Sequence, residues 1–235
     1  MTSLIEIKDL TKVYKKKPAL LNVSFTAEKG RIIGLLGPNG SGKTTLLKAM
    51  NGLLETEGTL LIDGNRPGVE TKGIISFLPE RSYLDESMKV KKMLAFFNDF
   101  YADFDLDKAK SLLKDMNIDE EAKIKQLSKG NKEKVQLILV LSRKAKLYLL
   151  DEPIGGVDPA ARDYILDLIL KMYDPGSTVI ISTHLITDVE RVFDDVIFLK
   201  EGEIVLKGDA DTIREDHGKS IDELFREVFQ CSLSC

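Results

Sequence analysis

The stretch GPNGSGKTT at residues 37–45 decides the fold of this chain. It fits the pattern G-x-x-x-x-G-K-[ST], in which glycines let the backbone wrap closely around a phosphate group. The apolar run RIIGLLG at 31–37 predicts a short buried strand before it, and a helix should begin near Lys43. A glycine-rich turn with a chance lysine would lack this strand–loop–helix setting. The stretch therefore predicts an anion site, where backbone N–H groups and a helix N-terminus point at a phosphate.

The side chains of this loop suit a triphosphate together with a magnesium ion. Lys43 would reach the β- and γ-phosphates, and the hydroxyl of Thr44 would ligate Mg²⁺. The predicted phosphate-binding residues are Gly37, Pro38, Asn39, Gly40, Ser41, Gly42, Lys43, Thr44 and Thr45.

A second motif, KLYLLDEP at 146–153, joins a buried strand to two carboxylates at its C-terminal end. In open α/β sheets that end of a strand faces the ligand crevice. Asp151 is expected to hold Mg²⁺, directly or through water, and Glu152 to take a proton from an attacking water. A bare Asp-Glu pair would more often be a solvated turn, but its company with the phosphate loop favours a catalytic role.

His184 follows the apolar run VIIST at the end of another predicted strand. The chain has 2 histidines, and the other, His217, lies in a polar segment where solvation is the simpler interpretation. A lone histidine is more often structural, yet this position at a strand end favours contact with a γ-phosphate. Together with Lys43 and Glu152, His184 completes the predicted catalytic set.

The order of elements predicts an α/β fold. Segments 4–14 and 20–28 partly alternate and indicate an antiparallel layer, while buried strands separated by helices indicate a mainly parallel central sheet. Further predicted elements are strands at 31–37, 58–64, 73–79, 146–153 and 177–184, a helix at 159–173, and a hairpin at 195–208 that turns at Glu201 and Gly202. We expect residues 1–235 to form one domain, with a helical subdomain inserted at about 83–143 and a C-terminal tail at about 209–235.

Composition narrows the function further. The net charge is −4, and no Lys/Arg run exceeds KKK at 15–17, which argues against a nucleic-acid partner. Cys231 and Cys235 are poor support for a metal or a disulfide, so a reducing compartment is the simpler interpretation. No signal-peptide pattern begins the chain, and no apolar run approaches the ~18 residues of a membrane span. If a membrane is involved, another chain must supply the span.

With these motifs in this order, the chain resembles the ATP-binding subunit of an ABC transporter over residues 4 to about 208. The resemblance implies a P-loop NTPase core that binds ATP with Mg²⁺. It implies that Tyr14 stacks on adenine, although an ordinary strand aromatic is the alternative. Glu80 stands where the family usually has glutamine, in a loop that senses Mg²⁺, the γ-phosphate and the membrane subunit, so Glu80 joins Thr44 and Asp151 as a predicted metal ligand. Asp158, in GGVDP, matches a loop that crosses a dimer interface.

The segment LSKGN at 127–131 aligns with the family signature, usually Leu-Ser-Gly-Gly-Gln. The resemblance implies a head-to-tail dimer in which each ATP lies between the phosphate loop of one subunit and the signature of the other. A helix should run from about Asn131 to Arg143, and its N-terminus suits an incoming γ-phosphate. A plain serine N-cap is the alternative. The predicted signature residues are Ser128, Lys129, Gly130 and Asn131.

Besides Glu80, three further positions depart from the family pattern: Lys129 replaces a glycine, Asn131 replaces the glutamine, and Gly155 stands where serine is frequent. Lys129 either adds positive charge near the phosphates or points to water. Because Ser128 and Glu152 remain, we expect an active ATPase. Its second subunit would be another copy or a different ATPase chain.

The expected role is a peripheral subunit on the cytoplasmic face of the membrane, bound to separate transmembrane permease subunits. The compact domain and the LSKG signature favour an exporter. A soluble switch of the same family, in repair, translation or cofactor assembly, is the alternative. A non-hydrolysing ATP-binding module is a third hypothesis, which Glu152 disfavours.

Two apolar patterns remain. Five aromatic residues at 96, 97, 100, 101 and 104 include four at helical spacing, 97, 100, 101 and 104, which predict an apolar helix face. A groove for a cytoplasmic helix of the membrane subunit is the functional alternative, and the two are compatible. Apolar residues at 221, 224, 225, 228 and 229 predict a short amphipathic helix packed on the core.

Overall fold

A six-stranded sheet forms the centre of the computed structural model, which describes residues 3–155, 159–173 and 176–230. Its strand order is β5-β6-β7-β3-β8-β9. Neighbouring strands from β5 to β8 run parallel, and β9 runs antiparallel to β8. The strands are β3 (Ile32–Leu36), β5 (Ile75–Leu78), β6 (Leu147–Asp151), β7 (Thr178–Thr183), β8 (Asp195–Lys200) and β9 (Glu203–Asp209). The predicted parallel centre and the hairpin at its edge are both confirmed.

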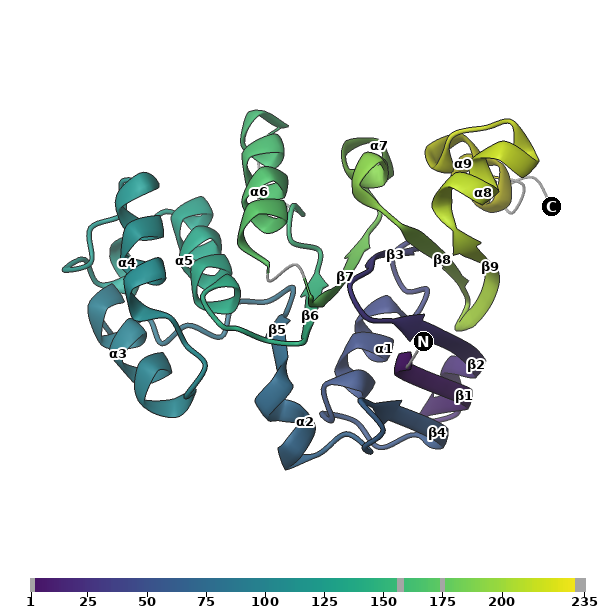
Figure 1. The fold of residues 1–235 in the computed structure, drawn as a ribbon, viewed down its shortest axis with the longest axis horizontal. Helices are drawn as coiled ribbons and strands as arrows, with labels where there is room; N and C mark the ends of the chain where they lie inside the picture. Colours follow the sequence, from purple (N-terminus) through teal and green to yellow (C-terminus); the bar gives the residue numbers. More distant parts are fainter. Residues whose placement is uncertain (1–2, 156–158, 174–175, 231–235) are drawn as a thin grey trace.

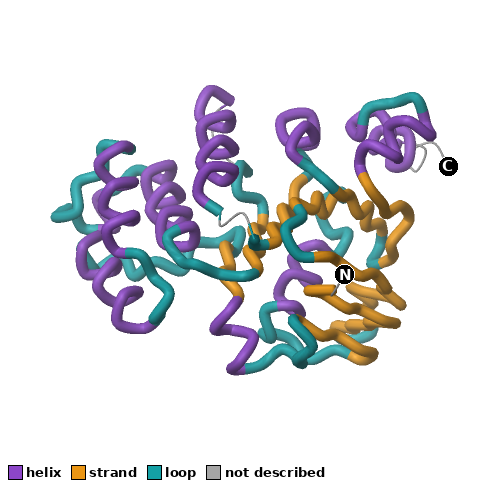
Figure 2. Tube along the Cα trace, viewed as in Figure 1, coloured by secondary structure: helices purple, strands orange, loops and turns teal. Residues whose placement is uncertain are grey.

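A second, antiparallel sheet lies beside the first and has the order β2-β1-β4 (Figures 1 and 2). Strand β1 (Ser3–Tyr14) pairs with β2 (Lys17–Glu28) on one side and with β4 (Glu57–Ile62) on the other. Alternating burial along β1 and β2 leaves one face polar, as the partial alternation of the sequence predicted.

Helix α1 (Lys43–Met50) packs between the two sheets (Figure 1). Its Leu46, Leu47 and Met50 are fully buried in a cluster that includes Leu35 of β3. Burying each such side chain is worth about 1.5–3 kcal/mol, so this cluster fixes the start of α1 at the end of the phosphate loop.

Residues between β5 and β6 are helical, as predicted, and gather on one side of the molecule (Figure 1). The segment contains α3 (Val90–Phe100), α4 (Leu106–Asp115), η1 (Ile124–Gln126) and α5 (Lys129–Leu141). Helix α5 begins at Lys129, earlier than the predicted start at about Asn131, because the side chain of Ser128 caps it.

The remaining helices are α2 (Val69–Ile74), α6 (Pro159–Met172), α7 (Ile186–Val189), η2 (Glu190–Val192), α8 (Ala210–His217) and α9 (Ile221–Gln230). The sequence did not predict α2, and it placed the start of the next strand at Gly73 when β5 begins at Ile75. A hydrogen bond stabilises the start of α2: the hydroxyl of Thr71 accepts from the backbone N–H of Gly68 at 2.8 Å. Helix α6 begins with Pro159, which confirms the predicted helix.

One part of the predicted aromatic face is wrong. Phe97 and Phe104 are buried and Tyr101 is half-buried, but Phe100 is 69% exposed. Helix α3 ends at Phe100, so the spacing of 3.6 residues per turn does not continue to Tyr101 and Phe104.

The tail forms two helices, α8 and α9, joined at Gly218, which has a positive φ of 60°. The predicted amphipathic helix is α9: Ile221 is buried, and the rings of Phe225 and Phe229 contact Phe198 of β8. Cys231 and Cys235 lie outside the described residues.

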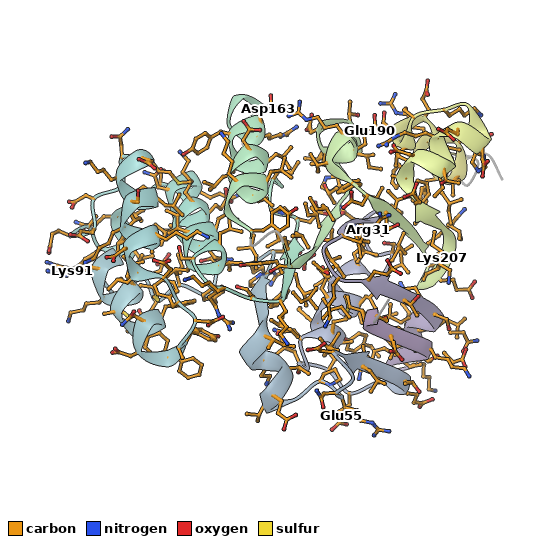
Figure 3. All side chains as sticks on the ribbon, viewed as in Figure 1. Arg31, Glu55, Lys91, Asp163, Glu190 and Lys207 are labelled. Atoms are coloured by element: carbon orange, nitrogen blue, oxygen red, sulfur yellow. The ribbon has the colours of Figure 1, made fainter. Side chains whose placement is uncertain are left out.

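Arg31, just before β3, joins that strand to the neighbouring β8–β9 hairpin by ion pairs (Figure 3). Its guanidinium donates to Asp195 of β8 at 2.7 Å and to Asp209 of β9 at 2.9 Å. These carboxylates raise the pKa of Arg31, and they tie the start of β3 to the neighbouring hairpin.

Within the described ranges, no helix combines the length and the apolar character needed to cross a membrane. The same ranges hold no group of three or more His, Cys, Asp or Glu side chains placed to bind a metal ion by themselves.

Candidate nucleotide-binding site

The phosphate loop links β3 to α1 through glycines that no other residue could replace without strain. Gly40 and Gly42 have φ values of 82° and 112°. A Cβ on Gly37 would lie 2.3 Å from the carbonyl oxygen of Leu199, and one on Gly42 would lie 2.5 Å from that of Ala19. The loop is therefore packed tightly against β8 and β2, and its backbone is exposed on the opposite side.

A turn far along the chain braces the same loop. The N–H of Gly202, between β8 and β9, donates to the carbonyl of Ser41 at 2.9 Å. The N–H of Leu21 in β2 donates in turn to the carbonyl of Gly202 at 2.9 Å. Both contacts fix the loop backbone in place.

Lys43 lies inside the loop that precedes it. The side chain is only 6% exposed, and its Nζ donates to the carbonyl oxygens of Gly37 at 2.7 Å and Pro38 at 3.3 Å. Nζ also lies 3.5 Å from Oε1 of Glu152. A buried cation is thus held by loop carbonyls and a carboxylate, all of which an anionic ligand could replace.

The register of the parallel strands brings the second and third motifs to the same edge as the loop. Leu36 at the end of β3 pairs with Thr183 of β7, and Asp151 at the end of β6 pairs with Ser182. His184 follows β7 directly. The carboxyl ends of three adjacent strands therefore present the loop, the two carboxylates and the histidine together.

Asp151 is buried, and only one of its two carboxylate oxygens has a geometrically defined hydrogen bond to a described residue. The residue is 1% exposed, and the hydroxyl of Ser182 donates to Oδ1 at 2.6 Å. Oδ2 is buried and lacks a hydrogen-bond partner among the described residues. Burial raises the pKa of Asp151; the hydroxyls of Ser182 and Thr44 lower it, and the charges of Glu80 and Glu152 raise it further. A buried, unsatisfied carboxylate oxygen near a threonine hydroxyl suits a hard divalent cation such as Mg²⁺.

Glu152 is held in an unusual backbone conformation between two basic side chains. Its φ is 51°, and its N–H donates to the carbonyl and the hydroxyl of Ser182, each at 3.1 Å. His184 Nδ1 lies 3.0 Å from both Oε1 and Oε2 of Glu152, with Lys43 on the other side. Strain of this kind costs on the order of 1–3 kcal/mol and here directs a carboxylate at the loop.

The loop, Lys43 and Glu152 line a hollow of about 250 Å³, which we call the phosphate-loop hollow. The hydroxyl oxygen of Ser41 is buried and has no hydrogen-bond partner in the part of the chain that the structure describes. The residues that line the phosphate-loop hollow are Ala19, Asn39, Gly40, Ser41, Gly42, Lys43, Thr44, Thr45, Glu80 and Glu152. A glycine cradle, a buried hydroxyl and a lysine at this hollow suit a polyphosphate, and Asp151, which interacts with Thr44 of the hollow, suits a magnesium ion bound to it.

The sequence predicted most of this arrangement but missed Ser182, which fixes both Asp151 and Glu152. The available signal was a polar residue within an apolar strand, two positions before His184. Predicted Glu80 lies at the hollow. Tyr14 lies at the end of the β1–β2 hairpin, is 44% exposed, and is approached by Lys12 Nζ at 5.4 Å from the ring centre.

The signature segment occupies a different place. Ser128 Oγ accepts from the N–H of Asn131 at 3.3 Å, so the serine N-cap is present. The side chain of Lys129 is 80% exposed and lies 3.9 Å from Glu133, while a Cβ on Gly130 would meet nothing. None of the residues 128–131 lines the phosphate-loop hollow of the described chain.

A second hollow of about 280 Å³, the α5 hollow, lies between α5, the segment after β5 and the segment after β6. Lys129 and Glu80 both line it, together with Asp151 and Glu152. Gly155 closes one side, where an added Cβ would lie 3.2 Å from the Cβ of Glu152. Asp158 lies outside the described residues.

Comparison with known proteins gives one family. The family model described as ABC transporter matches residues 20–155. An uncharacterised ABC transporter ATP-binding protein of Methanocaldococcus jannaschii is 36% identical over 219 residues, which cover 91% of this chain and 80% of that protein. The SkfA peptide export ATP-binding protein SkfE of Bacillus subtilis is 30% identical over 209 residues, covering 86% of this chain and 87% of that protein.

A solved structure described as the ATP-binding subunit of an ABC transporter has the same fold. It superposes with a TM-score of 0.86 at 30% identity and covers 95% of this chain and 98% of its own. The two sheets and the helical segment are thus arranged as in that protein.

Proposed function

The chain belongs to the ABC transporter family of ATP-binding subunits, and from this premise we propose that it hydrolyses ATP to power an exporter. The observation that carries the proposal is Glu152, held between Lys43 and His184 at the mouth of the phosphate loop. A chain that only bound nucleotide would not need a carboxylate fixed at that point.

The loop supplies the binding site for the triphosphate. Lys43 would exchange the carbonyls of Gly37 and Pro38 for phosphate oxygens, and the buried hydroxyl of Ser41 would gain a partner. Thr44, Glu80 and Asp151 would hold Mg²⁺, which when bound neutralises phosphate charge. Tyr14 would stack on adenine, because its hairpin meets the loop where Ala19 contacts Gly42.

Glu152 would act as the general base. Its carboxylate can accept the proton of a water attacking the γ-phosphate, which typically contributes 10²–10⁴-fold to a rate. His184 would orient that carboxylate through Nδ1 while its other ring nitrogen reaches the γ-phosphate. Lys43 would stabilise negative charge on the β- and γ-phosphates.

The signature would complete the site of a second subunit. Its residues lie apart from the phosphate-loop hollow of their own chain, and α5 begins with a serine cap and an exposed lysine. Free N–H groups and positive charge at a helix N-terminus suit a γ-phosphate on a facing subunit. ATP would then close a dimer of two copies, or of this chain with another ATPase, and Asp158 would lie at that interface.

The membrane partner would dock on α3. Phe96 and Phe100 are 52% and 69% exposed and stack with ring centres 6.0 Å apart, and Tyr83 is 43% exposed nearby. These rings fit an amphipathic helix of a transmembrane permease, placing the chain on the cytoplasmic face of the membrane. SkfE, whose name assigns it to peptide export, supports the direction of transport.

Purification of the tagged chain from membranes, followed by an ATPase assay, tests the proposal. We expect transmembrane subunits to co-purify and ATP hydrolysis to require Glu152. Hydrolysis by a chain recovered only from the soluble fraction, without membrane subunits, would favour a soluble switch of the same family.

A further inference from the structure

One face of α5 is hydrogen-bonded at nearly every turn to the chain segment 73–86, a set of contacts that we call the α5 seam. The α5 positions are 132, 136 and 140, spaced by four residues, followed by Arg143 after the helix. Residues at this spacing share one face of a helix. The seam therefore joins the helix that begins with the signature to β5 and the loop that follows it.

Three of these contacts join α5, or a residue just after it, to Ile75, Ser76 and Glu86, away from Glu80. Ser76 Oγ donates to the carbonyl of Val140 at 2.8 Å, and Arg143 donates to the carbonyl of Ile75 at 2.5 Å. Lys132 Nζ pairs with Glu86 at 2.5 Å on the surface. The first two hold the body of the helix to the strand, and the third is an exposed ion pair of small energetic value.

The contact of Gln136 is the one that lies next to the nucleotide site, because it is made to the residue before Glu80. It is 4% exposed, and its Nε2 donates to the carbonyl of Pro79 at 3.1 Å. Pro79 immediately precedes Glu80, which lines the phosphate-loop hollow. Gln136, Pro79 and Glu80 also line the α5 hollow together, so the amide contact lies at the edge of open space beside the Glu80 segment.

The same helix carries the signature to its N-terminus. Gln136 lies five positions after Asn131, which at 1.5 Å per residue is about 7.5 Å along a rigid helix. A shift of the Glu80 segment would thus be passed through one side-chain amide to the signature residues. The amide also supplies a hydrogen-bond donor to a half-buried carbonyl, that of Pro79.

We propose that Gln136 is a positioning residue that couples the two ATP sites of the dimer. It links Glu80, at the site of its own chain, to Ser128 and Gly130, which serve the site of the facing chain. Occupation of one site then sets the position of the signature at the other. This inference rests on the proposed function. It adds a residue that belongs neither to the segment around Glu80 nor to the signature.

The test compares Gln136→Met with Ser76→Ala. Methionine keeps the volume and removes the donor, whereas Ser76→Ala removes another buried hydrogen bond of the same seam, away from Glu80. In wild type we expect the Hill coefficient of ATP hydrolysis to exceed one and to approach the limit of about two for two sites. Gln136→Met should reduce it to about one and raise the half-saturating ATP concentration up to about tenfold, the size expected for one hydrogen bond. Binding of an ATP analogue to the isolated chain should change less than about twofold.

Ser76→Ala should lower thermal stability and leave the Hill coefficient at the wild-type value. Wild-type cooperativity in Gln136→Met, equal loss in both variants, or a wild-type Hill coefficient of one would overturn the inference. Absence of ATP hydrolysis in wild type would overturn the proposed function and this inference with it.

A measurement on the unmodified chain covers the case in which Gln136→Met does not fold. Amide hydrogen exchange with and without ATP should show protection changing together in 80–86 and 129–135. A change in the first segment with none in the second would contradict the coupling.

Discussion

Nδ1 of His184 lies 3.0 Å from both carboxylate oxygens of Glu152. An ionised carboxylate only accepts hydrogen bonds, so in that state Nδ1 is the donor of this contact and the ring orients the carboxylate. Lys43 Nζ lies 3.5 Å from the same group, so one glutamate meets the phosphate loop on one side and the end of β7 on the other.

Lys43→Ala should abolish ATP turnover and sharply weaken nucleotide binding, because it removes the cation that the loop holds for the phosphates. Steady-state ATPase assays and equilibrium binding of a fluorescent ATP analogue measure both effects. Turnover at the wild-type rate would refute the assignment of this loop.

Glu152→Gln should bind Mg-ATP normally and turn over about 10²–10⁴-fold more slowly, because only the proton acceptor is lost. The variant should accumulate as an ATP-dependent dimer, which analytical ultracentrifugation detects. A purely monomeric variant at saturating ATP would argue against dimer closure, unless a different ATPase chain is the natural partner.

Glu80→Gln should keep ATPase activity, since an amide oxygen can still ligate Mg²⁺. Glu80→Ala should instead lose stimulation by the membrane partner more than it loses nucleotide binding. Both variants are compared with wild type in detergent and after reconstitution with the permease. If Glu80→Ala altered neither turnover nor stimulation, Glu80 would have no place in the site.

Asp151→Asn should stabilise the nucleotide-free chain while abolishing Mg²⁺-dependent turnover. Burial disfavours the charged form of Asp151 in the folded state and so raises its pKa above the usual 3.8. The free energy of unfolding therefore falls as the pH rises from the pKa of the unfolded chain to the higher pKa of the folded chain. At neutral pH the neutral amide removes this cost and can still accept from Ser182. The midpoint of thermal unfolding should rise by about 2–4 °C for each kcal/mol gained in the free energy of unfolding. An unchanged or lower midpoint would mean that the carboxylate is not destabilising.

Mixing two inactive variants tests whether the signature acts in trans. Ser128→Arg should block the site of the facing subunit, and Lys43→Ala should disable its own. In a mixed dimer one site is then doubly defective and the other is intact, by two-fold symmetry. Equal mixing makes half of the dimers mixed, so activity should recover to roughly a quarter of wild type if the sites act independently. Differently tagged chains confirm subunit exchange, and exchange without recovery would show strict coupling or a signature that serves its own chain.

The phosphate loop, the buried strands and the paired carboxylates could be predicted because each depends on local pattern. Strand order and register could not, and they are what bring Ser182 beside Asp151. Helix α2 was missed because Thr71 and the backbone of Gly68 form its cap, a contact without apolar periodicity. Phe100 was assigned to the buried face because the spacing rule assumes a helix that continues, whereas α3 ends there.

The brace that Gly202 places on Ser41 has a consequence for synthesis of the chain. The loop leaves the ribosome early, but β7 and β8, which flank β3, and the turn that holds Ser41 are made much later. Contacts between such distant segments form only after both ends exist. The braced form of the loop therefore requires most of the chain, because it can form only after Gly202 has been synthesised.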